Sequence, residues 1–313
     1  MGKLLNLIRN EWMKLWHKKA TWVMVALLIA MIIGLVAITK WIDRNTETPA
    51  WEQTVSEELT IVKQQLATPG IDEETKKSLE EQQMLLQYRL DEGIAPLASN
   101  SLEGFIMDSY GMSSIITLLT VIVAAGIVAS EFSQGTIKML LARPVQRWKI
   151  LTSKFLTVVA FALFLTVVAY VVSLVMGLIF YEASGGGLLE VVNGQVTEVS
   201  YWLKSIWLNV LALGDVIIIA SFAFAIGTVF RSSSLAIGIA IFLMFTGSQF
   251  AFFLKNYEIV KYILFSHTFT QMETGGSFIE GMSTPFSVAV LVAYFIFFLA
   301  ISYWTFTKRD VTA

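Results

Sequence analysis

Asp215 is the side chain of this sequence that could most directly do chemistry, because its carboxyl group lies inside a long apolar stretch, Ser205–Phe230. If that stretch spans a lipid bilayer, inserting an ionisable group near its middle costs about 2.5–3.5 kcal/mol. The carboxylate then either lines a cavity as a proton or cation site or makes a hydrogen-bonded contact between helices. Gln249, in another apolar stretch, has the same two interpretations, and packing is favoured there. Both residues are candidate pathway or intramembrane polar groups.

The other reactive side chains exclude several kinds of catalytic site. Histidine occurs only at His17 and His267, which the expected topology places on opposite faces of a membrane, so the two cannot share a metal ion. The chain has no cysteine, and therefore no disulfide or thiolate site. It also lacks the patterns G-x-x-x-x-G-K-[S/T], G-x-S-x-G and H-E-x-x-H. We expect no catalytic residue, no metal site and no enzymatic activity in this chain.

The segment between Glu131 and Lys154, EFSQGTIKMLLARPVQRWKILTSK, carries the strongest functional signal. It is longer than a plain connection between two spans and mixes basic with apolar residues. Gly135–Thr136 predict a break in the preceding helix and a cap for a short amphipathic one. Arg143–Pro144 predict its end, because a residue before proline avoids the α region. A short amphipathic helix lying along the membrane surface is a feature that a partner protein can bind.

The same segment contains an ordered pattern of residues, which reads Glu131-Phe132-x-x-Gly135-Thr136-x-Lys138-x-Leu140-Leu141-x-x-Pro144-x-x-Arg147-x-x-Ile150-Leu151-x-x-Lys154. This pattern resembles the signature of the type-2 family of ABC transporter permeases. The rest of the chain is similar to that family in architecture alone. One departure is the insertion at residues 41–109, which is larger than the short first external loop of the polysaccharide-exporting members. The departure disfavours carbohydrate cargo and favours a peptide, antibiotic or lipid-like cargo.

The resemblance implies a permease that works as a pair and binds two separate ATPase subunits. The second permease is another copy of this chain or a paralogue, and ATP and Mg²⁺ are expected on the ATPase, with no cofactor in this chain. The resemblance further implies that the loop after the second span couples the permease to the ATPase. By position, the coupling residues are Glu131, Gln134, Gly135, Thr136, Lys138, Arg143, Pro144 and Arg147.

The amino-acid composition indicates whether this protein folds in water or in lipid. The chain has 313 residues, of which 56% are hydrophobic and only 15% charged, so one water-soluble core could not hide its apolar surface. Lipid removes that difficulty. A run of about 20 apolar residues crosses the hydrocarbon core as a helix, since helices satisfy their own backbone groups. The sequence contains six such runs: Thr21–Thr39, Tyr110–Ser130, Phe155–Tyr181, Ser205–Phe230, Ser232–Leu254 and Phe286–Thr307.

The distribution of Lys and Arg predicts the orientation of these spans. Segments on the side of the N-terminus are rich in basic residues: Lys3, Arg9, Lys14, Lys18, Lys19, Lys138, Arg143, Arg147, Lys149, Lys154, Arg231, Lys308 and Arg309. On the other side, the two short loops carry only Lys204, Lys255 and Lys261. We therefore expect a multi-pass protein of the bacterial plasma membrane with both termini in the cytoplasm.

The predicted fold is an all-α membrane protein with six transmembrane helices, an N-terminal interfacial elbow helix and an external helical hairpin insertion. Residues 1–20 form the amphipathic elbow helix, 21–40 the first transmembrane helix, 41–109 the external insertion, and 110–313 the other five transmembrane helices with the coupling loop at 131–154. In the insertion, Thr54-x-x-Glu57 predicts a capping box that opens the first helix, and Gly93 ends the second. Asn193–Gly194, between two β-prone runs, predicts a small β-hairpin.

These observations lead to one expected function and two alternatives from other classes. We expect the permease subunit of an ATP-driven exporter, moving amphipathic or hydrophobic cargo, with an ATPase subunit, a second permease and membrane lipid as partners and no nucleic acid. One alternative is a non-transporting sensor or immunity subunit whose external insertion binds a signal. The other is an ion-coupled secondary transporter that uses Asp215, although a lone carboxylate without inverted repeats argues against it.

Overall fold

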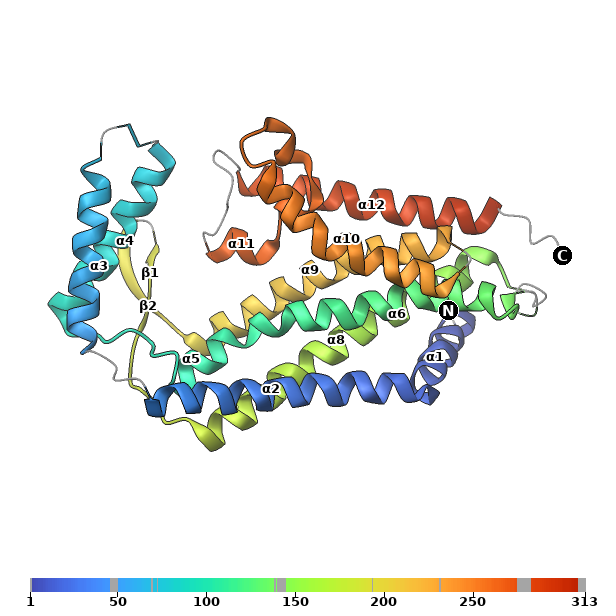
Figure 1. Cartoon of the computed structure of the whole chain (residues 1–313), viewed down its shortest axis with the longest axis horizontal. Helices are drawn as coiled ribbons and strands as arrows, with labels where there is room; N and C mark the ends of the chain where they lie inside the picture. Colours follow the sequence, from blue (N-terminus) through green and yellow to red (C-terminus); the bar gives the residue numbers. More distant parts are fainter. Residues whose placement is uncertain are drawn as a thin grey trace. The chain divides into compact units, whose positions relative to one another are not determined.

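The computed structural model describes residues 2–45, 50–68, 70–71, 73–137, 139, 145–192, 194–230, 232–274 and 283–308. Helices make up most of this part of the chain (Figure 1). The α-helices are α1 (Gly2–His17), α2 (Lys19–Asn45), α3 (Trp51–Leu66), α4 (Glu73–Glu92), α5 (Leu102–Met107), α6 (Ser113–Ser133), α8 (Arg147–Phe180), α9 (Tyr201–Val229), α10 (Ser233–Phe253), α11 (Phe269–Thr274) and α12 (Thr284–Lys308). Short 3₁₀ turns are η1 (Asp108–Met112), η2 (Glu258–Tyr262) and η3 (Leu264–Ser266), and the strands are β1 (Leu188–Val192) and β2 (Gln195–Val199).

Among the described residues, six helical segments are long and apolar enough to cross a membrane: Lys19–Asn45, Leu102–Ser133, Arg147–Phe180, Tyr201–Val229, Ser233–Phe253 and Thr284–Lys308. Apart from residues at their ends, the six predicted apolar runs coincide with these segments, which confirms an all-α membrane protein. The boundaries differ in places. The first span continues to Asn45 instead of ending near residue 40, and α8 already begins at Arg147, inside the predicted loop 131–154.

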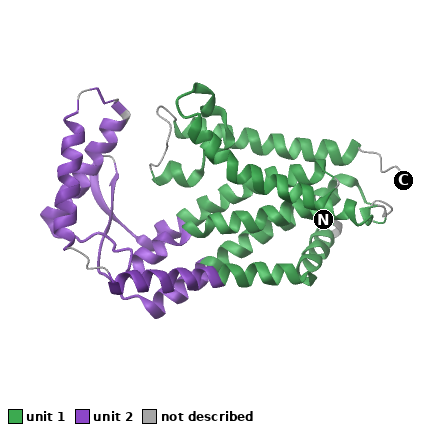
Figure 2. Cartoon of the chain, in the orientation of Figure 1, with its two compact units in different colours: residues 1–29, 111–169, 208–313 green, residues 30–110, 170–207 purple. Residues whose placement is uncertain are grey.

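The chain divides into two compact units (Figure 2). Unit 1 comprises residues 1–29, 111–169 and 208–313, and unit 2 comprises residues 30–110 and 170–207. Helices α2, α8 and α9 contribute residues to both units. Unit 1 holds every residue of the predicted coupling segment that the structure describes, and unit 2 holds the predicted external insertion.

Close helix packing holds unit 1 together. Helices α6 and α10 lie side by side (Figure 1), and α9 approaches α6 so closely that a Cβ atom on Gly227 would lie 2.9 Å from the carbonyl carbon of Ala125. Small residues are what allow such backbone contact between helices in lipid. A second cluster joins α9, η3 and α12 through Ile218, Leu264 and Leu291, all of which are buried.

A corner of aromatic and hydroxyl groups joins α1 to α2. The Thr21 hydroxyl donates to the Leu15 carbonyl (2.5 Å), and the Trp22 indole N–H donates to the Trp16 carbonyl (3.1 Å). Trp16 also packs edge-to-face on Phe164 of α8, with ring centroids 4.9 Å apart. These contacts set the direction in which α1 leaves the first span and hold it against α8.

In unit 2, α3 and α4 pack against each other through an apolar cluster (Figure 1). Its buried members are Val55, Leu59, Val62 and Leu86, which recur at the helical spacing of an amphipathic pair. Gly93 ends α4 with φ +66°, as predicted. The predicted capping box at Thr54 is wrong, because α3 begins at Trp51, whose ring packs on the same cluster and extends the helix by a turn.

The strands β1 and β2 form an antiparallel hairpin with Val192 opposite Gln195, which confirms the predicted hairpin and is the exception to an all-α chain. Its turn contains Gly194 at φ +78°. The hairpin contacts α4, and Arg89 of α4 donates hydrogen bonds to the carbonyls of Ala95 (3.2 Å) and Gly187 (3.0 Å). Burial lowers the pKa of Arg89, and these carbonyl acceptors compensate the desolvation of its guanidinium.

The contact between α9 and α6 gives a test of the packing of unit 1. We expect Gly227→Ala to lower the free energy of unfolding by about 1–3 kcal/mol, because the added methyl group would overlap the backbone of Ala125. The matched control is Gly238→Ala in α10, where a Cβ atom meets nothing within 4 Å. The control should be neutral or slightly stabilising, since alanine favours helix. Thermal unfolding in detergent, followed by circular dichroism, measures both, and a Gly227→Ala variant as stable as the control would contradict the packing.

Candidate functional site

The candidate site lies where three helices of unit 1 bring charged side chains together. Glu11 and Lys14 come from α1, Glu131 comes from the last turn of α6, and Lys154 comes from the third turn of α8. The local sequence explains the placement of each. On α8 the buried residues Ile150, Leu151, Phe155 and Val158 recur at helical spacing, and Lys154 occupies a position of the same stripe. Its ammonium group therefore points into the packed interior.

The four side chains form a closed ring of ion pairs. Lys154 Nζ lies 2.7 Å from Glu11 Oε2 and 3.0 Å from Glu131 Oε1. Lys14 Nζ lies 3.1 Å from Glu11 Oε1 and 3.1 Å from Glu131 Oε1. Two ammonium groups and two carboxylates alternate around the ring, so its net charge is zero. We call these four residues the ion-pair ring.

Burial makes the ion-pair ring costly to disturb. The side chain of Lys154 is 1% exposed, and those of Glu11 and Glu131 are 7% and 12% exposed. A charge removed from water to this degree is tolerated only when it is paired and hydrogen-bonded. Lys14, in contrast, is 44% exposed and closes the ring on its outer side. Burial alone would lower the pKa of Lys14, but the carboxylates of Glu11 and Glu131 outweigh that effect and raise it.

The residues after α6 continue the site toward the predicted coupling segment. Helix α6 ends at Ser133, and Gly135 adopts φ +72°, a left-handed conformation that stops a helix. The predicted break at Gly135 is thereby confirmed. The turn brings the Thr136 hydroxyl back to donate to Glu131 Oε2, which joins Thr136 to the ion-pair ring. Gln134 and Met139 are exposed beside this turn.

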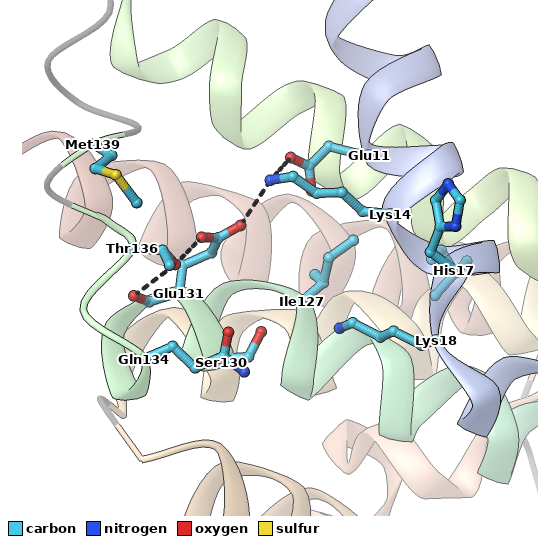
Figure 3. A pocket seen from close by; sticks show the side chains of 11 residues that line it. Glu11, Lys14, His17, Lys18, Ile127, Ser130, Glu131, Gln134, Thr136 and Met139 are labelled. Atoms are coloured by element: carbon cyan, nitrogen blue, oxygen red, sulfur yellow. Dashed lines mark hydrogen bonds and ion pairs between the residues drawn. The ribbon is translucent and has the colours of Figure 1, made fainter.

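A cavity of about 470 Å³ opens beside the ion-pair ring (Figure 3). It is lined by residues of α1 between Glu11 and His17, by Lys18 directly after that helix, by residues of α6 between Ile127 and Glu131, and by Gln134, Thr136 and Met139. Polar, charged and apolar side chains all face it. Figure 3 shows Lys14 of α1, and Lys18 just after α1, extending toward the side chains of α6.

Arg147 takes a different partner from the other predicted coupling residues. It begins α8, and its Nη1 donates to the Thr307 carbonyl near the C-terminus of α12 (3.1 Å). The last carbonyls of a helix have no partner within the helix and carry partial negative charge, so a guanidinium group stabilises them. One turn further along α8, the hydroxyl groups of Thr152 and Tyr303 are 2.6 Å apart. The start of α8 is thus fixed to the end of α12.

The predicted coupling residues therefore fall into three groups. Glu131, Gln134, Gly135 and Thr136 lie together at the end of α6, and Arg147 lies against α12. Lys138, Arg143 and Pro144 lie outside the described residues.

Asp215 makes a specific contact with the first turn of α11. Its Oδ1 accepts a hydrogen bond from the Phe269 amide (2.6 Å), and its Oδ2 accepts from the amide (3.2 Å) and the hydroxyl (2.6 Å) of Thr270. The contact satisfies backbone donors that a helix start leaves unpaired. This geometry favours the interpretation of Asp215 as a packing contact over that of an ion-coupling site.

Gln249 is exposed on α10 and lies in a second pocket of about 250 Å³. Ser248, Lys255, Phe265 and Gln271 line the same pocket. A packing contact of Gln249 therefore stays a prediction. In the described part of the chain, no group of three or more His, Asp or Glu side chains is arranged to hold a metal ion.

Sequence reasoning missed Glu11, Lys14 and Lys154 as members of one site, although the count of basic residues included Lys14 and Lys154. A signal was present in the periodicity. Glu11 lies four residues before the buried Leu15, Glu131 lies four residues after Ile127, and Lys154 lies among buried α8 residues. Each charge is thus on the apolar face of its helix, where it needs a partner of opposite sign.

Comparison with known proteins identifies similar sequences. The family described as "Protein of unknown function (DUF2705)" matches residues 76–312. The chain is similar to the "Uncharacterized protein YhcI" of Bacillus subtilis (strain 168), with 33% identity over 316 residues that cover 98% of this chain and 99% of the relative. It is also similar to the "Uncharacterized membrane protein YdbK" of the same organism, with 31% identity over 214 residues that cover 66% and 82%. The second relative's name agrees with the membrane location of this chain.

The ion-pair ring gives a prediction for stability. We expect Lys154→Met to lower the free energy of unfolding by about 3–5 kcal/mol, because it leaves two nearly buried carboxylates with Lys14 alone. Lys77→Met is the matched control, since Lys77 is 77% exposed and its ion pair with Glu81 spans 4.0 Å. The control should change stability by less than about 0.5 kcal/mol.

Thermal unfolding in detergent compares these two lysine variants. A restoring variant sharpens the test: in a Lys154→Met background, Glu11→Gln removes the one carboxylate left in excess and should regain part of the loss. Equal stability of Lys154→Met and Lys77→Met would show that the ring does not hold the three helices together.

Proposed function

This chain belongs to the DUF2705 family, and we propose that it is the membrane-spanning permease subunit of an ATP-driven exporter. In this proposal the chain hydrolyses no ATP itself. A separate ATPase subunit binds ATP and Mg²⁺ and docks on the segment between Glu131 and Arg147. The type-2 ABC permease pattern in that segment is the first support for the proposal.

The contacts made by the two ends of this segment are the main structural support for the proposal. At one end, Glu131 belongs to the ion-pair ring, and at the other Arg147 is bonded to the end of α12. Between them, Gln134 and Met139 are exposed, and Met139 is 71% exposed. A segment with anchored ends and accessible apolar and polar side chains suits a part that receives force from a partner and passes it to helices.

Force applied to this segment has two routes into unit 1. One route leads from Glu131 through Lys154 to α8 and through Glu11 to α1. The other leads from Arg147 to α12. Closure of the ATPase subunits around ATP would push the segment and tilt α6, α8 and α12, which exposes a transport pathway alternately to the two sides of the membrane.

The finer membrane arrangement is part of the same proposal. Helix α1 is the interfacial elbow, since its Trp12 and Trp16 rings pack on Phe164 and its basic residues suit anionic lipid. The excess of Lys and Arg on one side supports a plasma-membrane protein with cytoplasmic termini. The hairpin of α3 and α4 is then external, as a cap over the pathway or as a binding domain.

The working unit is a pair of permeases, made of two copies or of this chain and a paralogue. The six spans are apolar, so a pathway between two such chains favours amphipathic or hydrophobic cargo. A peptide, an antibiotic or a lipid-like molecule has that character.

Co-purification of ATPase activity tests the proposed docking segment. We expect wild-type protein from native membranes to carry an ATP-hydrolysing subunit, and Met139→Arg or Gln134→Arg to lose it by on the order of tenfold, the effect of disrupting a central interface contact. Neither side chain belongs to the ion-pair ring, so folding should persist. Met84→Arg in α4, also an exposed methionine, is the matched control and should retain the ATPase.

The result that contradicts the proposal is equally direct. Wild-type protein without ATPase activity, or equal retention by Met139→Arg and Met84→Arg, would remove the docking role of this segment. Transport that stops when ion gradients collapse while ATP is present would favour a secondary transporter. ATPase stimulation by a ligand without cargo movement would favour a sensor subunit.

A further inference from the structure

The cavity beside the ion-pair ring is lined in part by residues that the permease proposal does not use, namely Leu15, Lys18, Ile127 and Ser130. The lining mixes the apolar side chains Leu15 and Ile127 with the basic Lys14 and Lys18 and with Ser130, and Figure 3 shows Ile127 among the polar side chains that it labels. A volume of about 470 Å³ lies in the range of small-molecule sites. A cavity lined by both apolar and basic side chains suits a ligand that is itself amphipathic.

The charge facing this cavity is positive. Its two carboxylates, Glu11 and Glu131, are both paired within the ion-pair ring, where Lys154 and Lys14 together balance them, so Lys18 supplies the net positive charge. Lys18 is exposed at the cavity, and within the described part of the chain its ammonium group has no carboxylate within 4 Å. The partly exposed Lys14 adds hydrogen-bond donors at the ring's outer side. The lining can therefore accept one anionic group near Lys18.

The position of the cavity next to a membrane-spanning helix further restricts the chemical class of its ligand. It is built on the last turn of α1, directly before the first helix able to cross the membrane. Basic side chains next to a membrane span meet the headgroup region, and basic pockets between such helices recognise phosphate headgroups. Leu15 and Ile127 would then contact the glycerol and upper acyl carbons of the same molecule.

We propose that this cavity binds a phosphate-bearing anion, with Lys18 and Lys14 contacting the phosphate and Leu15 and Ile127 contacting the apolar part of the ligand. The phosphate belongs either to the headgroup of an anionic lipid or to a soluble glycerol phosphate. The inference needs only the membrane location of the chain and stands apart from the permease function. A bound anion at Lys18 would link α1 to α6 from outside the ion-pair ring.

A lysine pair in the chain provides the test. Lys18→Gln removes the proposed contact, whereas Lys19→Gln removes the same charge one residue later, at an exposed position that does not line the cavity. Purified protein in a maltoside detergent is titrated with short-chain phosphatidylglycerol, phosphatidylcholine or glycerol 3-phosphate, and the unfolding midpoint is followed. One basic contact near anionic lipid contributes about 1 kcal/mol, so Lys18→Gln should weaken the apparent affinity about fivefold and Lys19→Gln should leave it unchanged.

The outcomes separate the two sources of phosphate. Stabilisation by phosphatidylglycerol alone, reduced by Lys18→Gln only, identifies a lipid headgroup. Stabilisation by glycerol 3-phosphate with the same dependence on Lys18 identifies a soluble phosphate. The proposal is overturned if neither anion stabilises the protein, if phosphatidylcholine stabilises it equally, or if the two lysine variants weaken binding alike.

Discussion

The buried ammonium group of Lys154 is the constraint that determines how helices α1, α6 and α8 of unit 1 are arranged around the ion-pair ring. With its side chain 1% exposed, it must have carboxylates within reach. The two that it finds come from helices far apart in the sequence, Glu11 of α1 and Glu131 of α6. Three helices are therefore held in one register by a polar contact, while their apolar faces supply most of the burial.

The membrane-spanning helices were the most predictable part of the fold, because a run of apolar residues of the right length has one stable structure in lipid. Short sequence motifs also gave correct predictions where a turn requires a particular backbone conformation. Gly93 and Gly135 end helices in left-handed conformations, and the Asn-Gly pair predicted the turn between β1 and β2. The capping box at Thr54 failed because a side chain pattern was outweighed by tertiary packing, in this case that of the Trp51 ring.

Only those residues of the candidate site that are close together in the sequence could be predicted to belong to it. The sequence indicated Glu131 and its neighbours as one segment, but no local pattern states that Glu11 and Lys154 meet there. Such pairing depends on which faces of distant helices come together. Asp215 illustrates the same limit, since its position inside an apolar run was clear, yet its partners are the backbone groups of Phe269 and Thr270 in another segment.

The closed form of the ion-pair ring has a consequence for how this sequence can vary. Two positive and two negative groups balance at positions 11, 14, 131 and 154. A relative with the same helix packing can exchange a buried lysine of the ring only together with a carboxylate, so these positions are bound to change as a set. Positions 131 and 154 lie inside the region that the family match covers, and positions 11 and 14 lie before it. No local motif indicates this contact. Covariation between positions 11 and 14 on one side and 131 and 154 on the other is therefore the signal by which related sequences would reveal it.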